Sequence, residues 1–513
     1  MFNKQRIALN YKFSFRLHLI NYFGVKVIKF LYNNKDLEVY SYYCFLIPYF
    51  FFLIQRRFMP TLMVSISGIR GIIGDGLDPE VLVNYTSAYA DFCGKGKIIV
   101  GSDGRITGEM VRNIVIGTLQ AKGNDVVDIG ICPTPTVLFN VKKLNAVGGI
   151  QLSASHNPNE WNALKLLNSN GEFMSPEENS GMMKFLYAAD KKFSAWDKLG
   201  KVTRYRKGLD NHIEAVLKMD NINVAKIRKR KFKVLLDCVN GAGAYSMPKL
   251  LSMLGCKVIE MNCEKSGIFP RLPEPIPENL TATMEAVLKH KADLGIVVDP
   301  DVDRLVLITE KGEPFSEENT ITQAVKFYLS KKKGNVVVNL STTRAVEDVA
   351  KEFECQVFRS PVGEANVVKK MKEVDAVIGG EGSGGVIVPL TVFGRDALTG
   401  TAILLQHLVE YRGKMSGLKK SLPQYFIVKK KIELGPVQEG TAPRNPDEVI
   451  KKLAEKYKSE KINLEDGLRI DFDDHWVHFR KSNTEPIIRC IVEAKTKEDA
   501  ESLAEKYVGE IRN

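Results

Sequence analysis

A plan of apolar strand, polar turn and helix occurs three times along this sequence, and it restricts the chain to a small group of folds. The three passages are "KIIVGSDGR" (Lys97–Arg105), "FKVLLDCVNGAGA" (Phe232–Ala244) and "GNVVVNLSTTR" (Gly334–Arg344). They recur at intervals of about 100 to 135 residues, and from Met59 onward the chain alternates short apolar runs with amphipathic stretches. Strands that alternate with helices in this way are typical of βαβ units. The sequence therefore predicts three related α/β domains in series.

The chain is too long for a single domain. It has 513 residues, and domains average roughly 150 residues, which indicates three or four. The region after about Leu422 reads as strand, strand, turn, strand and helix, an α+β pattern unlike that of the three α/β passages. We therefore expect four domains, with boundaries at 59–205, 206–309, 310–422 and 423–513.

Residues 1–58 differ in composition from the rest of the chain. They hold nine Lys and Arg against two Asp and Glu, and 17 of the 45 aromatic residues. The run Tyr42–Ile54 is apolar or aromatic throughout, but it is shorter than the roughly 20 residues of a membrane-spanning helix, and Pro48 interrupts it. We interpret residues 1–58 as an extension outside the folded core, with Met59 as the true start of the protein. A membrane-surface anchor is the alternative.

Net charge and cysteine usage exclude several classes of partner. The formal net charge is +12, but +7 of it belongs to residues 1–58, so the remaining chain lacks the strong positive charge of a nucleic-acid-binding protein. The eight cysteines stand singly, with no Cys-x-x-Cys pair, which argues against a disulfide framework or a zinc site. This pattern fits a reducing, cytoplasmic location. We expect no nucleic-acid partner and, outside residues 1–58, no membrane partner, and the oligomeric state stays open.

The strongest local signal is "LGIVVDPDVDRLVLI" (Leu294–Ile308), in which three aspartates follow a buried-looking strand at every second position. Alternate residues of an extended backbone project to the same side, so Asp299, Asp301 and Asp303 are expected to converge. Converging carboxylates repel one another, and a divalent cation relieves that repulsion. Ligation by oxygen atoms alone suits Mg²⁺. An acidic surface loop is the alternative, and the apolar residues on both sides argue against it.

A serine-rich loop follows another apolar run. In "IQLSASHNP" (Ile150–Pro158) the strand gives way to Ser153, Ser155 and His156, and the Asn-Pro pair marks a turn. One interpretation is an ordinary strand exit followed by a helix cap. The other is a nucleophile or phosphate carrier at the end of a strand, where open α/β sheets place their chemistry. The local pattern does not decide between them.

Two further loops have the composition of ligand-binding sites. "RKSNTEPIIR" (Arg480–Arg489) joins a guanidinium fork to three side-chain donors in a tight turn, as in an anion-binding nest for phosphate. "IGGEGSGGVI" (Ile378–Ile387) has five glycines that let a ligand approach the backbone, with Glu381 and Ser383 able to bind sugar hydroxyls. Ordinary turn chemistry is the alternative for the first loop, and a plain mobile loop for the second.

Together these motifs resemble those of the α-D-phosphohexomutase family over nearly all of residues 63–513. "SASHNP" matches the family's phosphoserine loop, the three aspartates match its magnesium loop, "GEGSG" its sugar loop and "RKSNTEP" its phosphate loop. Smaller agreements are Arg70 in "GIRG", Arg105 in "SDGR", Asn162, Lys165 and the run "FPRLPEPIPENL". The resemblance implies three consecutive similar α/β domains with mixed sheets, followed by a smaller α+β C-terminal domain, around a central cleft.

The resemblance also implies a site for intramolecular phosphoryl transfer. Ser155 would carry a phosphoryl group against Mg²⁺, pass it to a hexose phosphate, and take back the other phosphate of the resulting bisphosphate. A hexose 1,6-bisphosphate activator is expected. The implied residues are Ser155, Lys165, Arg70, His156 and Arg304 for catalysis; Glu381, Ser383, Arg480, Ser482, Asn483 and Thr484 for substrate binding; and Ser155, Asp299, Asp301 and Asp303 for the metal.

Two positions depart from the family's pattern. Ala163 stands where many relatives have glycine, and Gly385 occupies the place of the histidine in the bacterial "GEMSGH" or "GEQSGH", so Lys165 and Arg70 remain as acid/base candidates. "GEGSGG" favours the phosphoglucosamine branch of the family, which interconverts hexosamine 6-phosphate and 1-phosphate, over the mannose/glucose branch. A non-catalytic sugar-phosphate-binding protein is the remote alternative, and such a protein would be expected to have lost Ser155 or one of the aspartates.

Overall fold

The structure is a computed structural model, and it describes residues 61–65, 68–188, 192–434, 444–481 and 487–512. The extension predicted for residues 1–58 lies outside these ranges. Within them, no helix combines the length and the apolar character that a membrane crossing requires.

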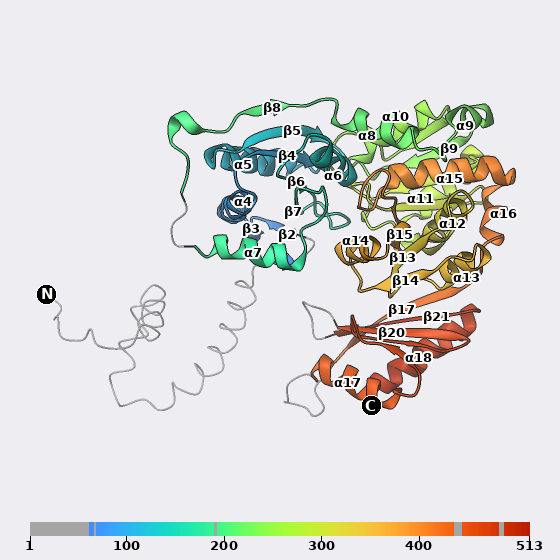
Figure 1. Cartoon of the computed structure of the whole chain (residues 1–513). Coiled ribbons are helices and arrows are strands. Elements are labelled where there is room, and N and C mark those ends of the chain that lie inside the picture. Colours follow the sequence, from blue (N-terminus) through green and yellow to red (C-terminus); the bar gives the residue numbers. More distant parts are fainter. Residues whose placement is uncertain (1–60, 66–67, 189–191, 435–443, 482–486, 513) are drawn as a thin grey trace, which may run out of the picture. The chain divides into compact units, whose positions relative to one another are not determined.

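The first sheet holds strands that run in both directions (Figure 1). Its order is β1-β2-β7-β6-β4-β5-β8, with β3 beside β2. Its strands are β1 (Met63–Ser65), β2 (Gly68–Ile73), β3 (Gly76–Leu77), β4 (Lys97–Ser102), β5 (Asp125–Ile131), β6 (Gly148–Leu152), β7 (Trp161–Leu167) and β8 (Val202–Arg204). Its helices are α4 (Pro79–Cys93), α5 (Gly108–Ala121), α6 (Thr134–Lys143) and α7 (Pro176–Leu186), followed by the 3₁₀ turn η1 (Trp196–Lys198). The central strand β4 is apolar at consecutive positions because both of its faces are buried.

The second and third sheets have four strands each. The second has the order β10-β9-β11-β12, and the third the order β14-β13-β15-β16. The strands of the second are β9 (Lys233–Asp237), β10 (Lys257–Met261), β11 (Leu294–Val298) and β12 (Leu305–Thr309); those of the third are β13 (Asn335–Asn339), β14 (Val357–Ser360), β15 (Ala376–Glu381) and β16 (Gly385–Ile387). The helices are α8 (Gly208–Leu217), α9 (Val224–Arg230), α10 (Gly243–Met253), η2 (Pro277–Asn279), α11 (Thr281–His290), α12 (Glu317–Leu329), α13 (Ala345–Glu352), α14 (Glu364–Glu373), α15 (Ala397–Tyr411) and α16 (Met415–Lys420).

One four-stranded arrangement occurs in all three sheets. A first strand (β4, β9 or β13) lies between a second and a third strand that run parallel to it, and a fourth strand runs antiparallel to the third. The three repeated sequence passages supply the first strand in each case. The prediction of three similar α/β domains with mixed sheets is therefore confirmed.

The last sheet is antiparallel throughout, with the order β17-β21-β20-β19-β18. Its elements are β17 (Phe426–Glu433), α17 (Pro446–Lys456), β18 (Lys461–Asn463), β19 (Leu468–Asp471), β20 (His475–Lys481), β21 (Ile487–Ala494) and α18 (Lys497–Arg512). One face of the sheet packs on α18, where Tyr507 and Ile511 join a cluster that contains Val477 and Phe479. This is the smaller α+β domain that the sequence predicts.

The hydrophobic core is not divided at every sheet. One cluster of buried residues runs from the second sheet, through Leu236 and Val298, into the third sheet at Val338 and Val386. The first and last sheets have clusters of their own. The second and third sheets therefore share a core on one face each, which holds the loops at their ends relative to one another, while alternate residues such as Val297 and Val337 belong to separate clusters.

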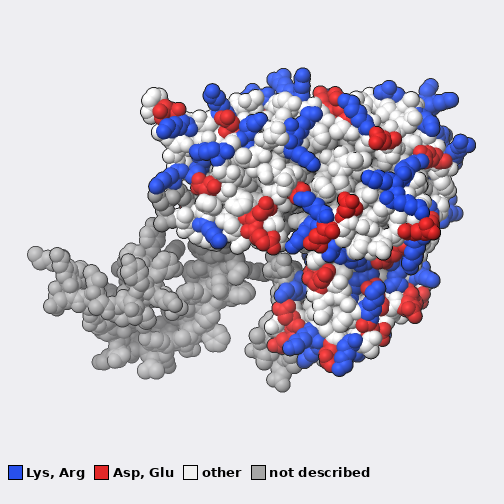
Figure 2. All heavy atoms as spheres, viewed as in Figure 1, with Lys and Arg blue, Asp and Glu red and all other residues white. Residues whose placement is uncertain are grey.

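The charged side chains of the described residues are mixed in sign on the face drawn in Figure 2. Lys and Arg lie among Asp and Glu across that face. The face does not present a large field of one sign.

Candidate active site

Three candidate loops occupy equivalent places in the three α/β repeats. Each loop connects the third strand of its repeat to the antiparallel fourth strand. The serine loop joins β6 to β7, the metal loop joins β11 to β12, and the sugar loop joins β15 to β16. The third strand in each case runs parallel to the first, so each loop lies at the carboxyl end of parallel strands, where α/β sheets bind ligands.

The serine loop brings its hydroxyl to the metal loop. Ser155 is buried, and its Oγ donates a hydrogen bond of 3.0 Å to Asp299 Oδ2. Its backbone has a φ of 50°, in the left-handed region that non-glycine residues seldom adopt. The backbone N–H of Ser155 donates to Ser153 Oγ at 2.9 Å. The strained turn thus aims the Ser155 hydroxyl at a carboxylate of the next domain.

Arg105 stabilises the serine loop through its guanidinium, a structural role that the motif "SDGR" did not indicate. Its guanidinium, which is shielded from solvent, forms a 2.8 Å ion pair with Asp103 and donates to the carbonyls of Pro158 and Trp161. Asp103 in turn accepts a 2.7 Å hydrogen bond from Ser153 Oγ. These contacts fix the backbone on both sides of Ser155.

The metal loop gathers three carboxylates that are all fully buried. Asp299, Asp301 and Asp303 have zero exposure, and one ligand oxygen from each lies within 4.8 Å of the others. Burial, together with the charges of Asp303 and Asp301, raises the pKa of Asp299 well above its usual range. The loop itself is strained, since Val302 has a φ of 61°. Such a cluster is stable as carboxylates only with positive charge beside it.

The free oxygen atoms of this cluster fit Mg²⁺. Asp301 Oδ1 and Asp303 Oδ1 are buried and lack a hydrogen-bond partner among the described residues. Asp299 Oδ1 accepts the backbone N–H groups of Asp303 and Arg304, both at 3.1 Å. Buried oxygens without donors, from three carboxylates and with a serine hydroxyl beside them, form the all-oxygen donor set that Mg²⁺ prefers.

Lys165 supplies one positive charge to the cluster. It lies on β7, and its Nζ is 2.6 Å from Asp301 Oδ2 and 3.4 Å from Asp303 Oδ2. Burial alone would lower the pKa of Lys165, but the two carboxylates outweigh it and the pKa is raised. Lys165 is therefore a cation at neutral pH.

The other predicted catalytic residues surround Ser155 less tightly. Arg70 on β2 donates to Asn157 Oδ1 at 3.3 Å, and burial lowers its pKa. His156 Nδ1 lies 3.4 Å from Ser155 Oγ, and burial, with the positive charge of Arg304, lowers the pKa of the imidazole to about 2. The side chain of Arg304 lies 3.8 Å from Glu274. A histidine with so low a pKa is neutral and a poor base.

The sugar loop has a fixed carboxylate. Glu381 is buried at the end of β15; its Oε1 accepts from Asn339 Nδ2 at 2.8 Å and from the Gly363 N–H at 3.0 Å. Its Oε2 forms a 2.7 Å ion pair with Arg395. Ser383 is partly exposed in the turn that follows. Glu381 is therefore held rigidly from three sides.

Arg395 is the site residue that motif analysis missed. Besides Glu381, its guanidinium binds Asp303 Oδ2 at 2.7 Å, so it joins the sugar loop to the metal loop. Burial would lower the pKa of Arg395, but Asp303 and Glu381 raise it well above its usual range. The only local signal is its place before Asp396, which caps the start of α15 by accepting from the Leu398 N–H.

The phosphate loop is described only in part. Arg480 lies on β20, with its Nε 2.8 Å from Asp466 Oδ2. Ser482, Asn483 and Thr484 lie outside the described residues. No contact found within the described ranges links Arg480 to the Ser155 and aspartate cluster, so the structure brings three of the four predicted loops together.

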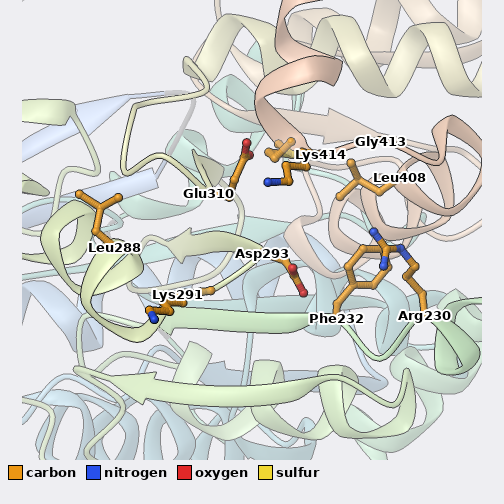
Figure 3. A pocket seen from close by; sticks show the side chains of 11 residues that line it. Arg230, Phe232, Leu288, Lys291, Asp293, Glu310, Leu408, Gly413 and Lys414 are labelled. Atoms are coloured by element: carbon orange, nitrogen blue, oxygen red, sulfur yellow. The ribbon is translucent and has the colours of Figure 1, made fainter.

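A cavity whose lining includes none of Ser155, Asp299, Asp301 and Asp303 is drawn in Figure 3. Its volume is about 370 Å³, and its lining includes Phe232, Asp293, Glu310 and Lys414. Asp293 immediately precedes β11, whereas Asp299 immediately follows it. The cavity and the metal loop therefore lie at opposite ends of the same strand.

Comparison with known proteins agrees with the domain order. Four family models match the chain in succession, described as phosphoglucomutase/phosphomannomutase alpha/beta/alpha domains I, II and III and the C-terminal domain. They cover residues 62–192, 210–312, 318–426 and 436–510.

Individual relatives are similar over nearly their whole length. A phosphoglucomutase/phosphomannomutase of Thermococcus kodakarensis is 36% identical over 445 residues, which is 85% of this chain and 96% of that protein. A probable phosphoglucosamine mutase of Methanopyrus kandleri is 34% identical and covers 87% of this chain and 97% of that protein. The crystal structure of a family protein from Burkholderia thailandensis has a TM-score of 0.75 at 25% identity, with 88% and 99% of the two chains covered. With the four sheets and the four domain matches in the same order, these findings establish that the chain belongs to the phosphoglucomutase/phosphomannomutase family of phosphohexomutases.

Proposed function

We propose that this phosphohexomutase interconverts hexosamine 6-phosphate and hexosamine 1-phosphate through a phosphorylated Ser155. The observation that supports it most directly is the hydroxyl of Ser155, which donates to the buried Asp299 beside two carboxylate oxygens that lack donors. A protein that only bound sugar phosphates would have no need of a strained serine aimed at a metal-type cluster. Relatives of this chain are named both as a probable phosphoglucosamine mutase and as a phosphoglucomutase/phosphomannomutase, so the preferred sugar has to be measured.

The phosphoryl transfer requires no reactant other than the phosphorylated Ser155 and the hexose phosphate. The bond from Ser155 Oγ to phosphorus breaks as a bond forms between phosphorus and a hydroxyl oxygen of the hexose phosphate, and the hydroxyl proton passes to Oγ. The bisphosphate so formed turns over in the site and returns its other phosphoryl group to Ser155 by the reverse steps. Hexose 1,6-bisphosphate would phosphorylate an unmodified Ser155 in the same way and so act as an activator.

The residues around Ser155 would work by positioning and charge. Lys165 is held as a cation by Asp301 and Asp303, and Arg70 and Arg304 add positive charge near His156. Such cations stabilise the charge that develops on phosphoryl oxygens. Ser155, Asp299, Asp301 and Asp303 would hold Mg²⁺, which when bound neutralises phosphoryl oxygens at the point of transfer. His156, with a pKa of about 2, would shape the loop.

The sugar preference is tested by a mutase assay with several hexose 6-phosphates. We expect kcat/KM for glucosamine 6-phosphate to exceed that for glucose or mannose 6-phosphate, because a cationic 2-amino group gains a charged hydrogen bond to Glu381. The advantage is about 1 kcal/mol, roughly five-fold. Arg395 already binds Glu381 Oε2, so the amino group would share that carboxylate with it. Glu381→Gln should reduce the difference in kcat/KM between glucosamine 6-phosphate and the two neutral sugar phosphates. Equal or better turnover of mannose 6-phosphate by the native protein would instead favour a phosphomannomutase/phosphoglucomutase.

The phosphate loop gives a second measurable prediction. We expect Arg480→Ala to raise KM for the sugar phosphate more than it lowers kcat, because the loop of Arg480, Ser482, Asn483 and Thr484 would bind the phosphate that is not transferred. Loss of one charge-assisted hydrogen bond costs ~1.5–3 kcal/mol, roughly a 10- to 150-fold rise in KM. Steady-state kinetics measures the change in KM, with Lys430→Ala as the control, since Lys430 lies on β17 outside the phosphate loop, is exposed and pairs with Glu505. An unchanged KM would make Arg480 a purely structural partner of Asp466.

A further inference from the structure

Gly385 leaves a space that another side chain fills. A Cβ atom added at position 385 would lie 2.2 Å from Arg395 Cδ and 2.8 Å from its Cγ. Gly385 does not have a positive φ, so its backbone does not demand glycine. The absence of a side chain is instead explained by the arm of Arg395, which passes over position 385.

The arm of Arg395 is fixed at both ends. Its backbone N–H donates to Glu364 Oε1 at 2.9 Å, and its Nε forms a 3.1 Å ion pair with Glu364 Oε2. The next residue, Asp396, is fully buried and accepts from His212 and Thr399. The guanidinium therefore emerges from an anchored backbone, with little freedom to move.

The two tips of the guanidinium reach two different loops. One terminal nitrogen lies 2.7 Å from Asp303 Oδ2 and the other lies 2.7 Å from Glu381 Oε2. The same two loops touch through their backbones, because the Leu305 N–H donates to the Gly384 carbonyl at 3.0 Å. A planar fork with donors in two directions can hold both carboxylates at once, whereas a lysine ammonium is a single point charge.

We propose that Arg395 is a positioning residue that sets the distance between the metal loop and the sugar loop, in the space that Gly385 leaves open. Arg395 and Lys165 both bind Asp303 Oδ2, whereas Oδ1 of the same carboxylate is buried and has no hydrogen-bond partner among the described residues. Binding at Glu381 Oε2 fixes the carboxylate that would orient the sugar. The inference rests on the proposed mutase function, since the loop spacing would decide where a sugar hydroxyl sits relative to Ser155.

The primary test is Arg395→Lys, which keeps the charge but replaces the two terminal nitrogens, one at Asp303 and one at Glu381, with a single ammonium group. We expect kcat to fall roughly 10- to 100-fold while KM changes by less than about three-fold, because misplacement of the reacting groups affects the transfer step more than phosphate binding. The thermal midpoint should stay within a few degrees of the native value, since the buried acids keep a cation. Calorimetric titration with Mg²⁺ alone should show binding weakened by misorientation of Asp303.

Lys122→Met is the control for loss of a buried ion pair as such. Lys122 is buried and pairs with Asp91 at 2.7 Å, at the C-terminus of α5 and so at the opposite edge of the first sheet from Ser155. The Lys122→Met variant should have a lower thermal midpoint than the native protein, with kcat and Mg²⁺ binding unchanged. A native kcat in Arg395→Lys would overturn the proposal.

Gly385→Ala tests the shared space directly. The added methyl group should displace the arm of Arg395 and lower kcat about ten-fold or more, whereas in an Arg395→Ala background it should change kcat by less than about three-fold, because the clash is gone. Equal effects in the two backgrounds would also overturn the proposal. If the native protein has no mutase activity, the proposed function fails. The effect of Gly385→Ala on the thermal midpoint and on Mg²⁺ affinity, compared between the native and Arg395→Ala backgrounds, would still report whether Arg395 and position 385 are coupled.

Discussion

Replacement of Ser155 by alanine is expected to lower turnover by at least about 10⁴-fold, because the variant has no atom that can carry the phosphoryl group. The hydroxyl of Ser155 is the group that donates to Asp299, and the loop around it is held by Arg105 and Ser153, so the fold should persist. The measurement is a coupled assay of sugar phosphate isomerisation, together with circular dichroism to establish that the variant is folded.

Ser153→Ala provides the matched control for this result. Ser153 lies two residues away and is also buried, but its Oγ accepts from the backbone N–H of Ser155 and donates to Asp103, not to an aspartate of the metal loop. Peptide mapping of the active protein should find phosphate on Ser155 in both the native chain and Ser153→Ala, and none in Ser155→Ala. Substantial turnover by Ser155→Ala, or phosphate on Ser153, would contradict the carrier role.

Removal of divalent metal is the second large effect. We expect a chelator to lower activity by roughly 10³-fold or more, and added Mg²⁺ to restore it, because Asp299, Asp301 and Asp303 bury three carboxylates with free oxygens and only part of the balancing charge. Asp301→Asn should need far more Mg²⁺ for half-maximal activity. The assay is turnover as a function of free Mg²⁺ at constant ionic strength.

The same site should stabilise the fold when metal binds. A ligand at about 100 times its Kd adds about 2.7 kcal/mol to the free energy of unfolding, so Mg²⁺ should raise the thermal midpoint by several degrees in the native protein and much less in Asp301→Asn. Asp91→Asn, which removes a carboxylate from the distant pair with Lys122, should respond to Mg²⁺ as the native protein does. Full activity in the presence of chelator, or an unchanged midpoint with Mg²⁺, would refute the metal site.

The architecture could be predicted because strands and turns leave local patterns. The three repeated passages became β4, β9 and β13. The three aspartates converge as expected, but they do so in the turn between β11 and β12 and not along an extended strand, since Val302 has a φ of 61° and its N–H donates to the Asp299 carbonyl. The serine, metal and sugar loops each follow the third apolar run of their repeat. The sequence therefore also contains the information that they occupy equivalent turns. Local periodicity determines the strands and the places where they end, so a single sequence carries that part of the architecture.

The role of Arg395 could not be predicted because no local pattern records it. Its partners Asp303 and Glu381 lie on two different sheets, and the contact exists only when both sheets are packed. In the sequence, Gly385 stands at the position of the histidine in the family's bacterial motif. In the structure, its lack of a side chain leaves room for the side chain of Arg395, ten residues later. Arg105 is a similar case, since its carbonyl partners near Pro158 come together only when the serine loop folds.

The core that the second and third sheets share has a consequence for how the protein unfolds. Side chains from Leu236 to Val386 belong to one hydrophobic cluster, so neither sheet can open without exposing apolar surface of the other. We therefore expect the second and third sheets to unfold together, whereas the first and last sheets, with clusters of their own, can melt or exchange amide protons separately. A cavity made anywhere in the shared cluster would therefore loosen the metal loop and the sugar loop together, even if it lay far from both.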